Sequence, residues 1–150
     1  MRKFVYAVVA GWALCLTCAA DEGEWLTDLV KAKDKARAEK KMILLDFNGS
    51  DWCPPCKALR QDVFSSPQFV AYAKTNLVLV DIDFPVQKKQ TEELRRANQA
   101  LAEKFSVEGY PTIVVLSCEG NELKKETGYS GQSAKAFVAE LDRLRKRDKS

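Results

Sequence analysis

Residues 42–57 read Met-Ile-Leu-Leu-Asp-Phe-Asn-Gly-Ser-Asp-Trp-Cys-Pro-Pro-Cys-Lys. The apolar run at 42–47 predicts a buried strand, and the polar residues 48–51 predict a turn. A helix is expected from about Pro54, because a proline in the first helical turn loses no intrahelical hydrogen bond. Cys53 and Cys56 therefore stand where a strand passes through a turn into a helix.

This placement gives the two cysteines a chemical meaning. Two cysteines separated by two residues can close a small disulfide ring, and Pro54 and Pro55 stiffen that ring. Cys53 lies at the helix start, where unpaired backbone N–H groups favour a thiolate and lower the pKa of a thiol. The expected reaction is thiol–disulfide exchange: Cys53 attacks a substrate disulfide, and Cys56 then releases the reduced substrate. Run backwards, the same steps oxidise the substrate.

Two other readings of the pair remain open. A static structural disulfide is one, although so small a ring constrains the unfolded chain little. A zinc site is the other, although zinc takes four ligands and the chain has no histidine. Cys118 is interpreted as a separate thiol near a late turn, and no bridge to it is expected.

The rest of the chain alternates between helical and strand patterns. Helices are predicted at 24–40, 67–75 and 87–104, and Ser133 is expected to cap a last one. Strands are predicted at 42–47, 77–83 and 112–117, with 123–127 pairing back as a hairpin. The order predicts an α/β fold with a central mixed β-sheet flanked by helices. The helix at 24–40 is expected to bury one face that carries Trp25, Leu29, Ala32 and Ala36. The helix at 87–104 is expected to bury a face that carries Leu94, Ala97, Leu101 and Phe105.

The chain resembles the exported thioredoxin-like proteins of bacteria over about residues 24–145. The resemblance rests on Leu45-Asp46-Phe47, Trp52-Cys53-Pro54-Pro55-Cys56-Lys57, Gly109-Tyr110-Pro111-Thr112 and Gly128-Tyr129. It implies a thioredoxin fold with an extra N-terminal helix. It also implies a protein-disulfide oxidoreductase, more often a reductase than an oxidase or isomerase, whose redox group is the cysteine pair and which needs no cofactor or metal.

The resemblance also implies roles for single residues. Pro111 matches the family's cis-proline beside the cysteine pair, and the backbone of Tyr110 would bind an extended substrate chain. Asp46 matches the family's buried acid, which assists proton transfer at Cys56. The substrate groove is expected to include Trp52, Pro54, Tyr110, Pro111, Thr112 and Tyr129.

Two departures from the family pattern concern Asp46. Seven positions separate it from Cys53, where family members usually have six. If the turn at 48–51 absorbs the extra residue, Asp46 keeps its place; if the strand register absorbs it, Asp46 faces elsewhere. The family's lysine near the acid is also missing, because residues 77–80 are all apolar. We therefore expect no cation beside Asp46 and a raised pKa for its carboxyl group.

The first twenty residues resemble a secretory signal. Arg2 and Lys3 precede an apolar run at 4–16, and small residues follow up to Ala20. We expect cleavage after Ala20, a thioredoxin-like domain at 21–150, and a periplasmic or secreted protein. An uncleaved membrane anchor and lipid attachment at Cys18 are the alternatives.

Composition narrows the function further. The chain has 150 residues and a formal net charge of +3, which is too weak a field to suggest a nucleic acid as partner. The absence of histidine excludes His-based catalytic triads and His-ligated metal sites. Expected partners are proteins with thiols or disulfides and a membrane dithiol or disulfide carrier. A thioredoxin-fold chaperone or binding module is the competing class.

Overall fold

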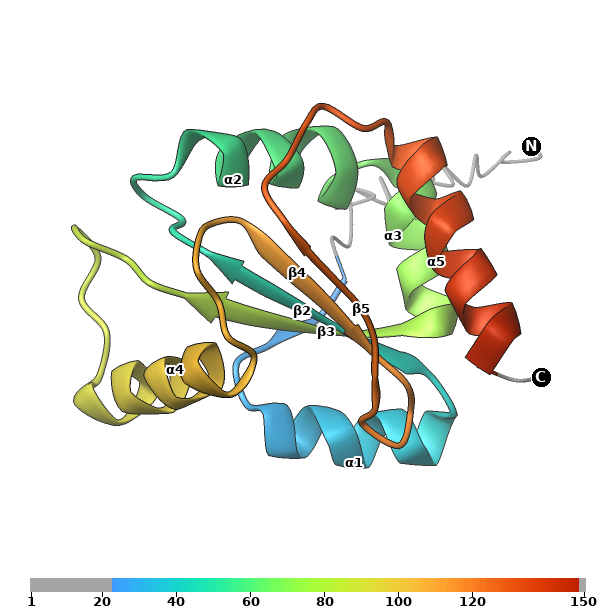
Figure 1. Cartoon of the computed structure of the whole chain (residues 1–150), viewed down its shortest axis with the longest axis horizontal. Coiled ribbons are helices and arrows are strands. Elements are labelled where there is room, and N and C mark those ends of the chain that lie inside the picture. The colour runs from blue at the N-terminus through green and yellow to red at the C-terminus, as the bar shows by residue number, and fades with distance from the viewer. Residues whose placement is uncertain (1–22, 149–150) are drawn as a thin grey trace, which may run out of the picture.

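The computed structural model describes residues 23–148. Figure 1 shows a central β-sheet with helices on both of its faces. The predicted signal sequence, its cleavage site and Cys18 lie outside the described residues. Within residues 23–148, no helix is both long enough and apolar enough to cross a membrane.

The sheet contains five strands in the order β1-β3-β2-β4-β5. The β1 and β2 strands run parallel to β3, whereas β4 runs antiparallel to both β2 and β5. This is the mixed sheet predicted from the element order, with its parallel part early and its hairpin late. The strands are β1 (Trp25–Leu26), β2 (Met42–Asn48), β3 (Leu77–Asp83), β4 (Thr112–Leu116) and β5 (Glu122–Thr127).

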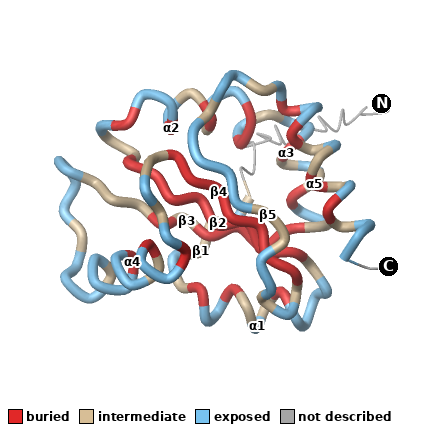
Figure 2. The backbone as a smooth tube through the Cα atoms, viewed as in Figure 1, coloured by how far each residue is buried: buried red, intermediate tan, exposed pale blue. Residues whose placement is uncertain are grey.

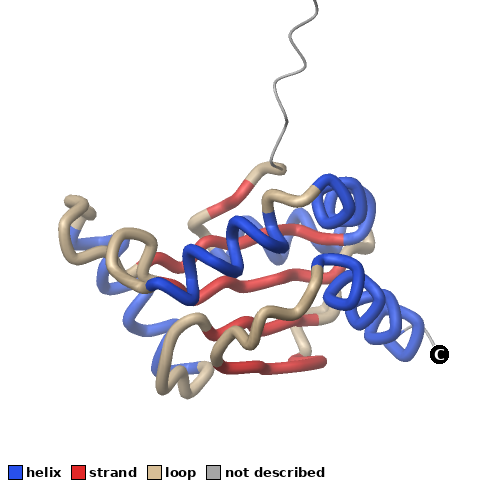
Figure 3. Tube along the Cα trace, turned by 90° about the horizontal axis from the view of Figure 1, so that it is seen from above, coloured by secondary structure: helices blue, strands red, loops and turns tan. Residues whose placement is uncertain are grey.

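Two helical layers cover the sheet, and Figure 3 shows helical segments lying across its side-by-side strands. The helices are α1 (Leu29–Glu39), α2 (Pro54–Leu59), α3 (Pro67–Asn76), α4 (Glu92–Lys104) and α5 (Ala134–Asp148), and a π-helical turn η1 (Arg60–Phe64) continues α2 directly. Side chains from alternate positions of β2, β3 and β4 supply one core cluster under η1, α3 and α5 and another under α1 and α4. Burial is accordingly concentrated in the sheet (Figure 2).

The first predicted helix begins later than expected. Trp25 and Leu26 form a short strand that pairs with Leu79 and Val80 of β3. The helix starts after Asp28, whose carboxylate accepts hydrogen bonds from the N–H groups of Val30 and Lys31. Placing Trp25 on the helix was therefore wrong, because a cap residue follows it.

The helix predicted at 87–104 also begins later than expected. Thr91 is its N-cap and accepts a hydrogen bond from the Leu94 N–H, so residues 87–90 belong to the preceding loop. The predicted apolar face was partly wrong, because Ala97 is exposed and Asn98 is buried instead. The Asn98 amide nitrogen donates a 2.9 Å hydrogen bond to the carbonyl oxygen of Asp83, which compensates in part for burying this side chain, whose Oδ1 has no partner among the described residues.

Candidate active site

The cysteine pair lies at the start of α2, as predicted. Cys53 and Cys56 form a disulfide with their Cα atoms 5.3 Å apart, and both residues are buried. Cys53 is the N-cap of α2, and the two prolines occupy the first two helical positions. These positions carry no N–H, so the Cys56 N–H is the first amide donor of the helix. Electrostatic support for a Cys53 thiolate therefore depends on few donors.

Glycine at position 49 allows the turn before Cys53 to be tight. The N–H groups of Trp52 and Cys53 both donate to the carbonyl oxygen of Gly49, at 3.2 and 2.9 Å. The Trp52 indole lies so close to Gly49 that an added Cβ would come within 2.4 Å of the ring. The turn and its tryptophan therefore form one packed unit.

Trp52 joins this unit to the loops that follow β3 and precede β4. Its ring meets Tyr110 edge-on at 5.8 Å between centroids, and Tyr110 packs against Phe84 at 5.2 Å. Trp52 is 42% exposed. The three rings form an aromatic surface beside the cysteine pair, the site expected for a substrate chain.

The peptide bond between Tyr110 and Pro111 is cis. Phe47, near the end of β2, lies opposite Thr112 at the start of β4. The cis bond therefore lies at the same end of these strands as the turn that leads to the cysteine pair. The Pro111 carbonyl accepts a 2.7 Å hydrogen bond from Gly128. Within residues 23–148, the N–H and C=O of Tyr110 have no hydrogen-bond partner. They are therefore free to pair with an extended chain.

Two predicted groove residues form hydrogen bonds within the protein: Thr112, which is buried, and Tyr129, which is partly buried. The Thr112 hydroxyl donates to the Gly109 carbonyl at 2.7 Å and contacts the Thr127 hydroxyl at 3.0 Å. The Tyr129 hydroxyl lies 3.2 Å from a carboxylate oxygen of Asp62 on η1, and it donates to the Gln132 carbonyl at 3.0 Å. Thr112 thus supports the β4–β5 pairing, and Tyr129 links the loop after β5 to η1.

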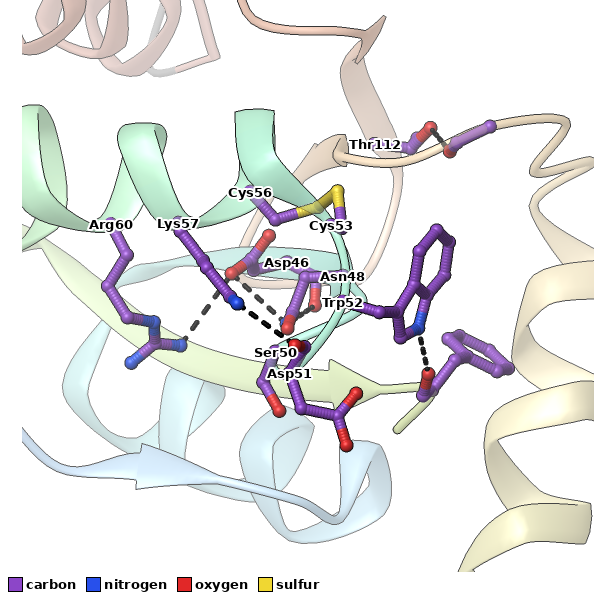
Figure 4. Close-up of a disulfide and its surroundings, with 12 residues drawn as sticks. Asp46, Asn48, Ser50, Asp51, Trp52, Cys53, Cys56, Lys57, Arg60 and Thr112 are labelled. Atoms are coloured by element: carbon purple, nitrogen blue, oxygen red, sulfur yellow. Dashed lines mark hydrogen bonds and ion pairs between the residues drawn. A yellow bond between two sulfur atoms is a disulfide. The ribbon is translucent and has the colours of Figure 1, made fainter. Parts of the chain in front are cut away.

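Asp46 is buried in β2 under the start of α2 (Figure 4). The strand keeps its register with β3 through Asn48 and with β4 through Phe47, so the turn absorbs the extra residue between Asp46 and Cys53. The expectation that no cation lies beside it was wrong: an Arg60 nitrogen is 3.7 Å from Asp46 Oδ2. This cation comes from η1, one helical turn after Cys56, and the neighbouring position on β3 holds Asp81.

Burial raises the pKa of Asp46 to about 7, although the Arg60 guanidinium opposes the shift. Its Oδ1 atom is buried and has no hydrogen-bond partner among the described residues. A carboxyl group with such a pKa gains and loses a proton near neutral pH, as a proton carrier for a thiol must.

A model of the thioredoxin-like domain family matches residues 29–145. This chain belongs to the thioredoxin-like domain family. The resemblance drawn from the motifs is thus confirmed, and so is the thioredoxin fold. Family membership together with the bonded Cys53–Cys56 pair makes the chain a thiol–disulfide oxidoreductase.

Two chlamydial proteins and one solved structure are similar to this thioredoxin-like chain. The disulfide bond reductase DsbH of Chlamydia pneumoniae is 32% identical over 123 residues, covering 82% of this chain and 73% of that protein. The thioredoxin-related protein DsbJ of the same organism is 30% identical over 134 residues, covering 85% of this chain but 38% of DsbJ. The solved structure of a DsbH oxidoreductase superposes with a TM-score of 0.75 at 28% identity, covering 91% of this chain and 95% of that one.

Sequence reasoning missed three residues around the thioredoxin-like site. Asp51, in the turn, accepts hydrogen bonds from the N–H groups of Val86, Gln87 and Lys88. Arg60 and Asp81 flank Asp46. Asp81 carried a usable signal, because it is an acid within a mostly apolar strand. Asp51 and Arg60 act on residues far from them in the sequence and carried none. Within residues 23–148, no group of three or more cysteine, aspartate or glutamate side chains is placed to hold a metal ion.

Proposed function

We propose that this thioredoxin-like oxidoreductase reduces disulfides of protein substrates, with Cys53 as nucleophile and Cys56 as resolving thiol. The observation that carries the proposal is the cysteine pair at the N-terminus of α2, with the cis bond of Pro111 at the adjacent sheet edge. Its redox group is the pair itself, so no cofactor is invoked.

The substrate chain would lie across the aromatic surface of Trp52, Phe84 and Tyr110. Its backbone would pair with the unpartnered N–H and C=O of Tyr110. This arrangement brings a substrate disulfide to Cys53, whose thiolate attacks one sulfur while the other leaves with the electron pair. Cys56 then bonds to Cys53 and releases the second substrate sulfur. Two electrons pass from the protein to the substrate.

The direction of electron flow is supported by similarity. DsbH, 32% identical to this chain, is named as a disulfide bond reductase. We expect a reductase to be exported by the segment at 1–20 and to receive electrons from a membrane dithiol carrier, because glutathione is not maintained as a reductant outside the cell membrane. An oxidase or isomerase would instead need a partner that removes electrons.

The reduction potential of the pair tests the direction. The protein is equilibrated with glutathione or dithiothreitol buffers, and the oxidised fraction is followed by tryptophan fluorescence. A value near −270 mV, about that of thioredoxin, supports the reductase. A value near −120 mV, about that of a strong disulfide donor, would make the protein an oxidase.

Substitution of the cysteines tests whether exchange is the function at all. Cys53→Ser should abolish exchange, Cys56→Ser should accumulate mixed disulfides with substrate proteins, and Cys118→Ser should do neither. If Cys53→Ser left substrate binding intact and the wild type exchanged no disulfide in any buffer, the protein would be a binding module of this fold.

A further inference from the structure

Asp46 does not stand alone beneath the cysteine pair. Asp81 lies opposite it in the parallel register of β2 and β3. The Asn48 amide nitrogen donates to Asp81 Oδ1 at 2.7 Å and to Asp46 Oδ2 at 3.3 Å. An Arg60 nitrogen lies 3.7 Å from each of the same two carboxylate oxygens. One cation and one amide therefore serve two carboxyl groups (Figure 4 shows Asp46, Asn48 and Arg60).

We propose that Arg60 and Asp81 are positioning residues that together set the proton occupancy of Asp46, Arg60 by attracting its charge and Asp81 by repelling it. They thereby set the pH range over which Cys56 is deprotonated. The inference rests on the proposed function, because the proton matters through the exchange reaction.

Burial is the largest cause of the raised pKa of Asp46, and the charged groups that face it show why Arg60 and Asp81 have the largest electrostatic effects. From β3 come Asp81 and Asp83, and from η1 comes Arg60. Asp83 repels the charge of Asp46 less strongly than Asp81 does, and its carboxylate accepts hydrogen bonds from the N–H and hydroxyl of Ser50.

Among residues 23–148, the other elements around Asp46 add no ion pair to it. On α2, the Lys57 ammonium donates instead to the Asp51 carbonyl. From β4 the partner is Ile113, which is apolar. Beyond the effect of burial, the charge of Asp46 therefore depends chiefly on attraction by the partly exposed Arg60 guanidinium and repulsion by the partly buried Asp81 carboxylate.

The affected step is the release of substrate from the mixed disulfide. Asp46, as carboxylate, takes the proton of the Cys56 thiol. The Cys56 sulfur then bonds to the Cys53 sulfur while the bond between Cys53 and the substrate sulfur breaks. The electron pair leaves on the substrate sulfur, which takes a proton from water or from Asp46. More repulsion from Asp81 keeps Asp46 protonated and unable to accept, and more attraction from Arg60 does the opposite.

The test is a pair of substitutions with opposite expected signs. Asp81→Asn keeps an oxygen to accept the Asn48 hydrogen bond but removes the charge. It should lower the titration midpoint of the Asp46 carboxyl carbon in ¹³C NMR by about one pH unit. Arg60→Gln should raise the midpoint by at least as much, because the Arg60 charge acts on Asp46 more strongly than the Asp81 charge does, and Arg60→Lys should restore much of the attraction. Asp34→Asn, on the exposed side of α1, is the matched control and should not move it.

The pH dependence of the rate of mixed-disulfide resolution should show the same effect. Its midpoint should move by the same amount and in the same direction as the Asp46 titration in each variant. Equal signs for the two variants, or no shift in either, would overturn the inference. If Arg60→Gln does not fold, Asp81→Asn and Arg60→Lys still decide it. The NMR titration does not depend on exchange. If the wild-type protein exchanged no disulfides, the proposed function would be wrong. The NMR titrations would still show whether Arg60 and Asp81 set the protonation of Asp46.

Discussion

The indole N–H of Trp52 donates a 2.8 Å hydrogen bond to the carbonyl oxygen of Phe84. This bond ties the turn before the cysteine pair to the loop after β3, 32 residues away in sequence. Both rings also meet Tyr110, so three loops form one surface. The surface beside Cys53 is thus held by tertiary contacts and not by any single motif.

Gly49→Ala should disturb this surface. The added Cβ would lie 2.4 Å from the Trp52 ring, so the indole must move and its bond to Phe84 must break or lengthen. We expect a loss of about 1–3 kcal/mol in the free energy of unfolding and a shifted Trp52 indole N–H resonance. Gly109→Ala, whose Cβ would lie 3.4 Å from Thr127, serves as control and should leave that resonance in place. An unshifted resonance in Gly49→Ala would contradict the prediction.

Asp51→Asn should release the loop after β3. The Asp51 carboxylate accepts the backbone N–H groups of Val86, Gln87 and Lys88, and these bonds lower its pKa. Hydrogen exchange at the three amides should accelerate in the variant and remain unchanged in Asp34→Asn.

The same bonds predict a pH dependence. Because the folded-state pKa of Asp51 is depressed, its contribution is present above the ordinary value of 3.8 and is lost as pH falls through the lower folded value. Protection of the three amides should therefore be lost in acid only below about pH 4. Protection that fell already near pH 6 would point to another group.

Pro55→Ala should make the cysteine pair more oxidising. An N-cap side chain accepts from the N–H of the second or third helical residue, and Pro55 removes the first of these two donors from Cys53. Restoring the N–H should stabilise the Cys53 thiolate and raise the reduction potential by about 10–30 mV, with a lower pKa in thiol alkylation. Pro54→Ala restores an N–H that does not reach the cap and should change the potential less. Equal shifts in both variants would assign the effect to ring stiffness.

Asp46→Asn should stabilise the protein in alkaline solution. The folded-state pKa of Asp46, about 7, lies above its ordinary value of 3.8, so the wild type loses stability as pH rises between these values. That difference corresponds to about 4 kcal/mol as an upper limit. Denaturant unfolding at pH 4 and pH 8 should show the variant gaining up to this amount between the two. A difference that did not change with pH would show that Asp46 is not buried as an acid.

Much of the fold was predictable because local patterns and tertiary packing agree. The strand 77–83 was predicted with the bounds that β3 has, since its apolar run is buried between two helical layers. Ser133 caps α5 as predicted, with its hydroxyl accepting from the Ala136 N–H. Trp25 was placed wrongly because a two-residue strand is too short to show a period. Ala97 was placed wrongly because an apolar pattern cannot reveal that Asn98 has a buried partner.

The sequence alone determined the redox chemistry of this protein. The reacting groups lie within four consecutive residues, Cys53 to Cys56. The strand and turn before them in the sequence already indicate that a helix starts there. Only the tertiary structure decided which charges surround Asp46. Arg60, Asn48 and Asp81 meet there because η1 lies over neighbouring parallel strands. Electrostatic interactions depend on distances between residues far apart in the chain, and a sequence pattern does not contain those distances.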